Sequence, residues 1–110
     1  MIARIWHGWT ATRNADTYEN LLRGEMFPSM RRVDGFSGAH LLRRDAGAEV
    51  EFVTITYFTS LDAVRRFAGT DYETAVLHPQ AHALLSRYDA KSTHYEIRIT
   101  PEWRVATCRT

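Results

Sequence analysis

The segment 50–58, VEFVTITYF, restricts the fold of the chain more than any other part of the sequence. Nearly every position in it is β-branched or aromatic, which is typical of a strand. A turn signal at 45–47 precedes the segment and a helix start at 60–62 follows it. Alternation along the strand places Phe52, Thr54, Thr56 and Phe58 on one face and Val53, Ile55 and Tyr57 on the other. Neither face is distinctly polar, so we expect both faces of this central strand to be covered.

The composition narrows the class of protein. The 110 residues carry a formal charge of +1 and are 45% hydrophobic and 25% charged, as in an ordinary globular domain. Positive and negative side chains are interspersed, so no basic stripe indicates nucleic acid binding. The single cysteine, Cys108, cannot form an internal disulfide, and no apolar run approaches the roughly 20 residues that cross a bilayer. We therefore expect a cytoplasmic protein with one domain that binds neither nucleic acid nor membranes.

Hydrophobic periodicity divides the rest of the chain into strands and helices. The predicted elements are strand 2–9, helix 12–32, strands 36–44 and 50–58, helical pieces 60–69, 72–77 and 79–88, and strand 93–99. Pro28 falls inside the first helix and should kink or break it near Met26 and Phe27, because proline removes a backbone donor. The order β-α-β-β-α-β is that of a ferredoxin-like α+β fold with a four-stranded antiparallel sheet.

A ferredoxin-like fold covers one face of its sheet with helices, which leaves the apolar second face of the central strand to another surface. We predict a homodimer in which two such sheets pack face to face. The domain should span 1–99, followed by a C-terminal tail, 100–110. Trp103 in this tail is consistent with a disordered end or with an arm on the partner subunit, and we favour the arm.

Three stretches together resemble a known family. They are Trp6-His7-Gly8 on the first strand, PSMRRVDGFSGAHLLRR at 28–44, and YFTSLDAVRRF at 57–67. In these stretches, and in its length and element order, the chain is similar to the antibiotic biosynthesis monooxygenase family over residues 1–99. The resemblance implies a dimeric α/β barrel in which each protomer has a cleft between helices and sheet. Members include oxygenases that act on aromatic quinols without a cofactor, and monooxygenases that degrade haem.

The resemblance also implies where haem chemistry would lie. Haem-degrading members use an asparagine on the first strand, a tryptophan that closes the central strand, and a histidine on the following helix. The corresponding positions hold His7 or Trp6, Phe58 and His78. Haem binding with His78 as the iron ligand is therefore one alternative function. Phe58 also replaces the indole that the resemblance implies for cofactor-free quinol oxidation.

Oxidation by O₂ without metal or flavin needs a base, an apolar cavity and a donor for the developing anion, because the deprotonated substrate supplies the electrons. His7 or His78 is the candidate base, and Tyr57, Tyr72 or Arg66 is the candidate for holding the anion. Contacts to a flat aromatic ligand are predicted for Trp6, Phe58, Tyr57, Phe67 and His82. An ordinary structural role is the competing interpretation for each of these residues.

His78 and His82 are four residues apart, a spacing that places two side chains on one helix face. Such a pair can bind a metal, but no cysteine or second carboxylate pair nearby completes a zinc site. The alternative is that His78 caps the helix before Pro79 and that His82 is a partly exposed helix residue. We predict no bound metal. The leading hypothesis is thus a small, cofactor-free oxidoreductase of the monooxygenase type, and a dimeric binding module without catalysis is the third.

Overall fold

The protein is described by a computed structural model, in which residues 1–101 are placed. Trp103 and Cys108, and with them nearly all of the predicted arm at 100–110, lie outside the described residues. The strands are β1 (Ile2–Ala11), β2 (Phe36–Ala46), β3 (Glu49–Phe58), β4 (Leu85–Tyr88) and β5 (Thr93–Glu96). The α-helices are α1 (Ala15–Leu21), α2 (Phe27–Met30), α3 (Leu61–Ala68) and α4 (Ala81–Leu84). A 3-10 turn (Thr12–Asn14) precedes α1 and a π-helical turn (Leu22–Met26) joins α1 to α2.

All strands pair antiparallel in one sheet, in the order β2-β3-β1-β4, and β5 also pairs with β1. The sheet thus has the predicted α+β, ferredoxin-like arrangement, but five strands occupy its four positions. β4 lies opposite the C-terminal half of β1 and β5 opposite its N-terminal half. The predicted helix 79–88 is wrong beyond Leu84, because 85–88 extends and fills the remaining edge of β1. Pairing there satisfies backbone groups that a longer helix would leave open on β1.

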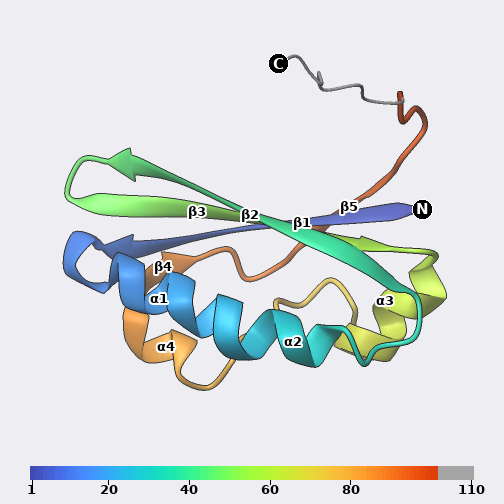
Figure 1. Ribbon diagram of the computed structural model, residues 1–110, viewed down its shortest axis with the longest axis horizontal. Coiled ribbons are helices and arrows are strands. Elements are labelled where there is room, and N and C mark those ends of the chain that lie inside the picture. The colour runs from blue at the N-terminus through green and yellow to red at the C-terminus, as the bar shows by residue number, and fades with distance from the viewer. Residues whose placement is uncertain (102–110) are drawn as a thin grey trace, which may run out of the picture.

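The helices all lie on one side of the sheet (Figure 1). Register places Thr54 of β3 opposite Trp6 of β1 and Thr56 opposite Arg4, and these side chains face the helices. Ile55, with Ile5 and His40 as its neighbours, faces away. We call the surface that carries Arg4, Trp6, Thr54 and Thr56 the helix-covered face. The second is the open face. Its members include Ala3, Ile5, His7, Trp9, His40, Leu42, Val53, Ile55, Tyr57 and Tyr95, and Arg44, Glu51 and Arg87 form its charged end.

The predicted face of one residue on β2 needs correction. Alternation alone groups Phe36 with Gly38 and His40, but the register shifts between Phe36 and Gly38. This bulge, with Gly38 at a φ of 149°, turns Phe36 onto the helix-covered face. Its ring packs edge-on against Phe58 at 5.7 Å.

Pro28 affects the first helix at the predicted place. The helix changes from π to α between Met26 and Phe27, and the Phe27 N–H donates to the Leu22 carbonyl as the closing bond of the π turn. Pro28 thereby lies at the start of α2, where a missing N–H is tolerated best. No helix in residues 1–101 has both the length and the hydropathy to cross a membrane.

Two clusters of buried side chains fill the space between helices and sheet. The first centres on Trp6, Tyr18 and Phe52 beneath α1 and α4. The second centres on Phe58 and Val64 beneath α2 and α3. Met26 and Phe27 pack against both, and a cavity remains where the clusters meet.

Candidate functional site

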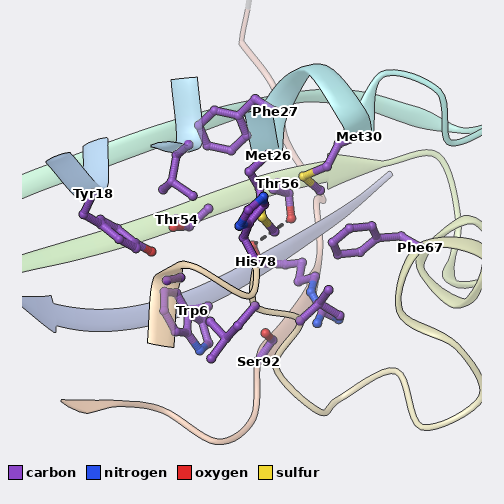
Figure 2. Close-up of a pocket in the computed structure, with 15 residues that line it drawn as sticks. Trp6, Tyr18, Met26, Phe27, Met30, Thr54, Thr56, Phe67, His78 and Ser92 are labelled. Atoms are coloured by element: carbon purple, nitrogen blue, oxygen red, sulfur yellow. Dashed lines mark hydrogen bonds between the residues drawn. The ribbon is translucent and has the colours of Figure 1, made fainter. Parts of the chain in front are cut away.

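The cavity between the helices and the sheet is small and mostly apolar, with a volume of about 40 Å³. Its walls come from every layer of the fold, as Figure 2 shows. The sheet contributes Arg4, Trp6, Thr54 and Thr56, the helices contribute Tyr18, Leu22, Met26, Phe27, Met30, Phe67 and Ala81, and the connections contribute Val76, Leu77, His78 and Ser92. Tyr18 points its hydroxyl toward the middle of this group. Burial raises the pKa of Tyr18, so its hydroxyl stays protonated and available as a donor.

Arg4 is the charged residue of the cavity wall, and only 5% of it is exposed. Its Nη1 donates to the carbonyl oxygen of Tyr72 and to Nε2 of His94 at 3.0 Å. Its Nη2 donates to the carbonyl oxygen of Thr74 at 3.1 Å. The guanidinium also lies over the ring of Phe67, 5.6 Å from its centre. Burial lowers the pKa of Arg4 to about 10, so the side chain is still a cation at neutral pH.

His94 supports Arg4 as a neutral imidazole. Because Arg4 has only donors, Nε2 of His94 is the acceptor and the ring proton lies on Nδ1. Burial first, and the nearby charge of Arg4 second, lower the pKa of His94, while Glu73 acts in the opposite direction. The ring also packs edge-on against Tyr72 at 5.1 Å. These contacts tie 72–74 to β1 and β5.

His78 closes the cavity between α4 and the π-helical turn. The backbone N–H of Gln80 donates to its Nδ1 at 3.2 Å, so the ring proton is on Nε2. Nε2 in turn donates to the Glu25 carboxylate at 3.2 Å. Glu25 belongs to the π-helical turn, and such turns are frequent at functional sites. Val76 and Leu77 continue the wall beside His78, in a stretch without helix or strand.

The structure brings three of the predicted site residues to this cavity: Trp6, Phe67 and His78. The indole N–H of Trp6 donates to the Asp89 carbonyl at 2.7 Å, which fixes the ring in the wall. Phe58 lies deeper, fully buried against Phe36 and Phe67, and does not line the cavity.

The other predicted residues lie elsewhere. His7 and Tyr57 are on the open face, where His7 Nδ1 donates to Asp89 Oδ2 at 3.2 Å and Tyr57 bonds to His40. His82 is exposed on α4 against Tyr88. Arg66 is exposed on α3 and donates to the Asp34 carbonyl. Tyr72 borders the cation only through its carbonyl oxygen. No group of three His, Cys, Asp or Glu side chains that could hold a metal is found within residues 1–101.

Arg4 and Ser92 are two of the polar wall residues that the motifs did not indicate, and both are 5% exposed. A signal for Arg4 is present in the sequence. Arg4 shares its strand face with Trp6 and Gly8, and a charged residue on the buried face of a strand is uncommon. Ser92 has no such signal, because it lies in the connection between β4 and β5.

No family model matches the sequence, and no curated protein matches it significantly. Solved structures do match. A candidate antibiotic biosynthesis monooxygenase from Bacillus cereus is 14% identical, with a TM-score of 0.66 over 93% of this chain and 97% of that one. SnoaB, a cofactor-independent oxygenase from Streptomyces nogalater, is 24% identical, with a TM-score of 0.61 over 92% and 98%. The heme-degrader MhuD from Mycobacterium tuberculosis, solved with two hemes in its active site, is 16% identical, with a TM-score of 0.59 over 93% and 100%. These similarities confirm at the level of the fold the resemblance that the sequence motifs indicated.

Proposed function

We propose, from the antibiotic biosynthesis monooxygenase fold of this chain, that the protein binds a flat, quinol-like aromatic molecule between helices and sheet and oxidises it with O₂ without metal or flavin. The observation that carries this proposal is the mostly apolar cavity between helices and sheet, whose walls include Trp6, Phe27 and Phe67. Aromatic rings offer flat surfaces against which a planar ligand packs. SnoaB is a cofactor-independent oxygenase and MhuD is a heme-degrader, so the fold alone does not select the ligand.

The cavity must widen for such a ligand. A volume of about 40 Å³ holds a few water molecules, whereas ligand pockets typically measure about 300 Å³ or more. We propose that the wall at 76–80 moves, because it has no helix or strand and a hydrogen bond between His78 and Glu25 joins it to the π-helical turn. The neighbouring residues 72–75 are held by Arg4 and by hydrogen bonds to 90–92. We therefore propose that the ligand enters beside His78.

The chemistry needs few groups from the protein. Removing a proton from an activated methylene or hydroxyl gives a carbanion or phenolate that reduces O₂ directly. For a methylene that becomes a carbonyl, one oxygen atom joins the carbon, and the other leaves as water with the two hydrogens of the methylene. His78 is the proposed base. Glu25 holds the proton on Nε2, and Nδ1 becomes the basic atom once the wall at 76–80 moves and Nδ1 gives up the hydrogen bond from the Gln80 N–H.

O₂ uptake by the purified protein with a panel of anthrones and quinols tests this proposal. We expect turnover with at least one member of the panel and a loss of at least tenfold in His78→Gln. Thr54→Leu should abolish both binding and turnover, because it fills the cavity from β3. Binding without O₂ uptake would favour the non-catalytic module. Four of the five histidines already have hydrogen bonds to protein groups, which is the observation that favours that alternative.

The residues present do not fit haem. The first-strand position on the cavity side holds Trp6, and the end of β3 holds the buried Phe58, so two of the three positions that the resemblance implies for haem chemistry differ. A hemin titration followed in the Soret region should therefore show no saturable shift that depends on His78. Saturation at one hemin per protomer that His78→Ala abolishes would reverse this conclusion.

We also propose that the protein is a homodimer through the open face. Leu42 and Tyr95 on this face are 49% and 55% exposed, and Ile5, Val53 and Ile55 lie between them. A contiguous apolar surface of this kind is typical of an interaction site. A second copy of the same sheet offers a matching surface, as the face-to-face barrel requires.

A further inference from the structure

Arg4 places a buried cation at the wall of an otherwise apolar cavity. We infer that the ligand of this cavity carries an ionised oxygen on its aromatic system, and that Arg4 binds this anion. The inference rests on the proposed function, because it assumes that an aromatic ligand enters the cavity. It adds the charge of the ligand, which neither the fold nor the aromatic walls determine.

The first support is the environment of the charge. The partners of Arg4 are two carbonyl oxygens and a neutral imidazole. None of the ion pairs within residues 1–101 involves Arg4. Buried charges in proteins are usually paired, because an unpaired charge away from water is costly. The cation at this wall is thus stabilised by dipoles and by the ring of Phe67, and it can gain further from an anion.

The second support is the donor capacity of the side chain. A guanidinium has five N–H groups, and the three hydrogen bonds to Tyr72, Thr74 and His94 use three of them. One N–H on Nε and one on Nη2 remain, which is the number that a carboxylate or phenolate accepts. The attraction is strong in an apolar surrounding, since the effective dielectric constant is lower than in water. Ser92, with its hydroxyl on the same wall, is a further potential donor.

A purely structural role for Arg4 makes a different prediction. If Arg4 only ties 72–74 to β1, the cavity behaves toward a ligand as an apolar pocket. Burial in such a pocket disfavours an anion and raises the pKa of a bound phenol, whereas an adjacent cation lowers it. The sign of the pKa change of a bound phenol therefore separates the two roles in the unaltered protein.

The first measurement is an absorbance titration of 1-naphthol bound to the wild-type protein between pH 7 and pH 9. We expect the pKa of the bound naphthol to fall by about one unit, a tenfold preference for the anion. A rise in that pKa overturns the inference. This measurement needs no variant, so it decides the question even if substitutions of Arg4 prevent folding.

The second measurement compares 2-naphthoate with 2-naphthylmethanol, which have the same ring system and differ in charge, by isothermal titration calorimetry. We expect at least tenfold tighter binding of the carboxylate to wild type and to the control Arg13→Gln, an exposed arginine outside the cavity. Arg4→Gln should remove the preference. Equal affinities of the wild-type protein for the two compounds overturn the anion site but not the proposed aromatic cavity. Failure of both compounds to bind overturns the proposed function as well.

Discussion

Each of the two faces of the sheet departs from the chemistry expected of it. The helix-covered face is mostly apolar but contains buried polar side chains, among them Arg4, Thr10 and Thr56, all 5% exposed or less. The open face has an apolar group of Ile5, Val53 and Ile55 in its middle, next to His7 and His40. Polar groups are costly to bury and apolar groups are costly to expose, so each face departs from the ordinary pattern for a reason. Arg4 and Thr56 line the cavity, and the exposed apolar groups form the surface that the proposed dimer would cover.

The largest difference between the faces should appear in stability. Phe52 is fully buried and its ring lies 4.8 Å from that of Tyr18, so Phe52→Ala should lower the free energy of unfolding by about 3–5 kcal/mol at any protein concentration. Leu42→Ala on the open face should have a cost that rises with protein concentration, because only a dimer buries that side chain. Urea denaturation at several concentrations measures both. A concentration-independent cost for Leu42→Ala would contradict the dimer.

A charge in the middle of the open face should separate the subunits. Ile55 lies between Ile5 and His40, so Ile55→Glu would bury an unpaired carboxylate in the proposed interface. We expect dimer dissociation to become at least 100-fold more favourable, measured by sedimentation equilibrium. Ala83→Glu adds the same charge to an exposed site on α4 and serves as the control. If the wild-type protein sediments as a monomer at every concentration, the open face is not a dimer interface.

Alternation along the sequence was sufficient to predict the two faces of β3, because the side chains of a regular strand point alternately to opposite faces. Alternation gave the wrong face where a bulge adds one residue to the strand. The bulge after Phe36 reverses that side chain, and no feature of the segment 36–44 gives its position beyond the presence of Gly38. The prediction of where α4 ends was wrong for another reason. Residues 85–88 have a helical pattern, but the unpaired edge of β1 is a tertiary feature that local propensity does not contain.

The site was harder to predict than the fold. Motifs indicated His78, Trp6 and Phe67, which do line the cavity, because the resemblance fixes their elements. His7 was indicated with Trp6, although neighbours on a strand point to opposite faces, and only one of them can reach the cavity. Arg4 was overlooked because arginine is usually on the surface. Its role depends on partners in 72–94, and contacts at that separation cannot be inferred from one sequence.

Gly8 tests how tightly the helix-covered face is packed. A Cβ at this position would lie 2.6 Å from Cη2 of Trp6 and 3.1 Å from Cδ2 of Leu85. The indole cannot retreat without losing its hydrogen bond to the Asp89 carbonyl. Gly8→Ala should therefore lower the free energy of unfolding by about 1–3 kcal/mol, measured by urea denaturation.

The matched control for Gly8 is Gly24 in the π-helical turn, where an added Cβ would have no neighbour within 4 Å. Gly24→Ala should stabilise the protein by up to about 1 kcal/mol, since alanine favours a helix more than glycine does. If both substitutions stabilise, the wall at Trp6 is adaptable and the cavity can widen from the sheet side too.

The smallest expected effect is a pH dependence that His94 gives to the helix-covered face. The folded protein holds the pKa of His94 below 6.5, through burial and then through Arg4, so the unfolded chain takes up the proton at higher pH. The contribution of this group is complete above pH 6.5 and is lost as the pH falls below that value toward the lowered pKa. His94→Gln should reduce the loss of stability between pH 7.5 and pH 5.5, measured by urea denaturation. This reduction should be smaller than the change in stability caused by Gly8→Ala.

His82→Gln, at an exposed site on α4, is the matched control and should keep the wild-type dependence of stability on pH. An unchanged slope in His94→Gln would show that Arg4 does not depend on a neutral imidazole. The cation at the cavity would then be held by the carbonyl oxygens of Tyr72 and Thr74 alone.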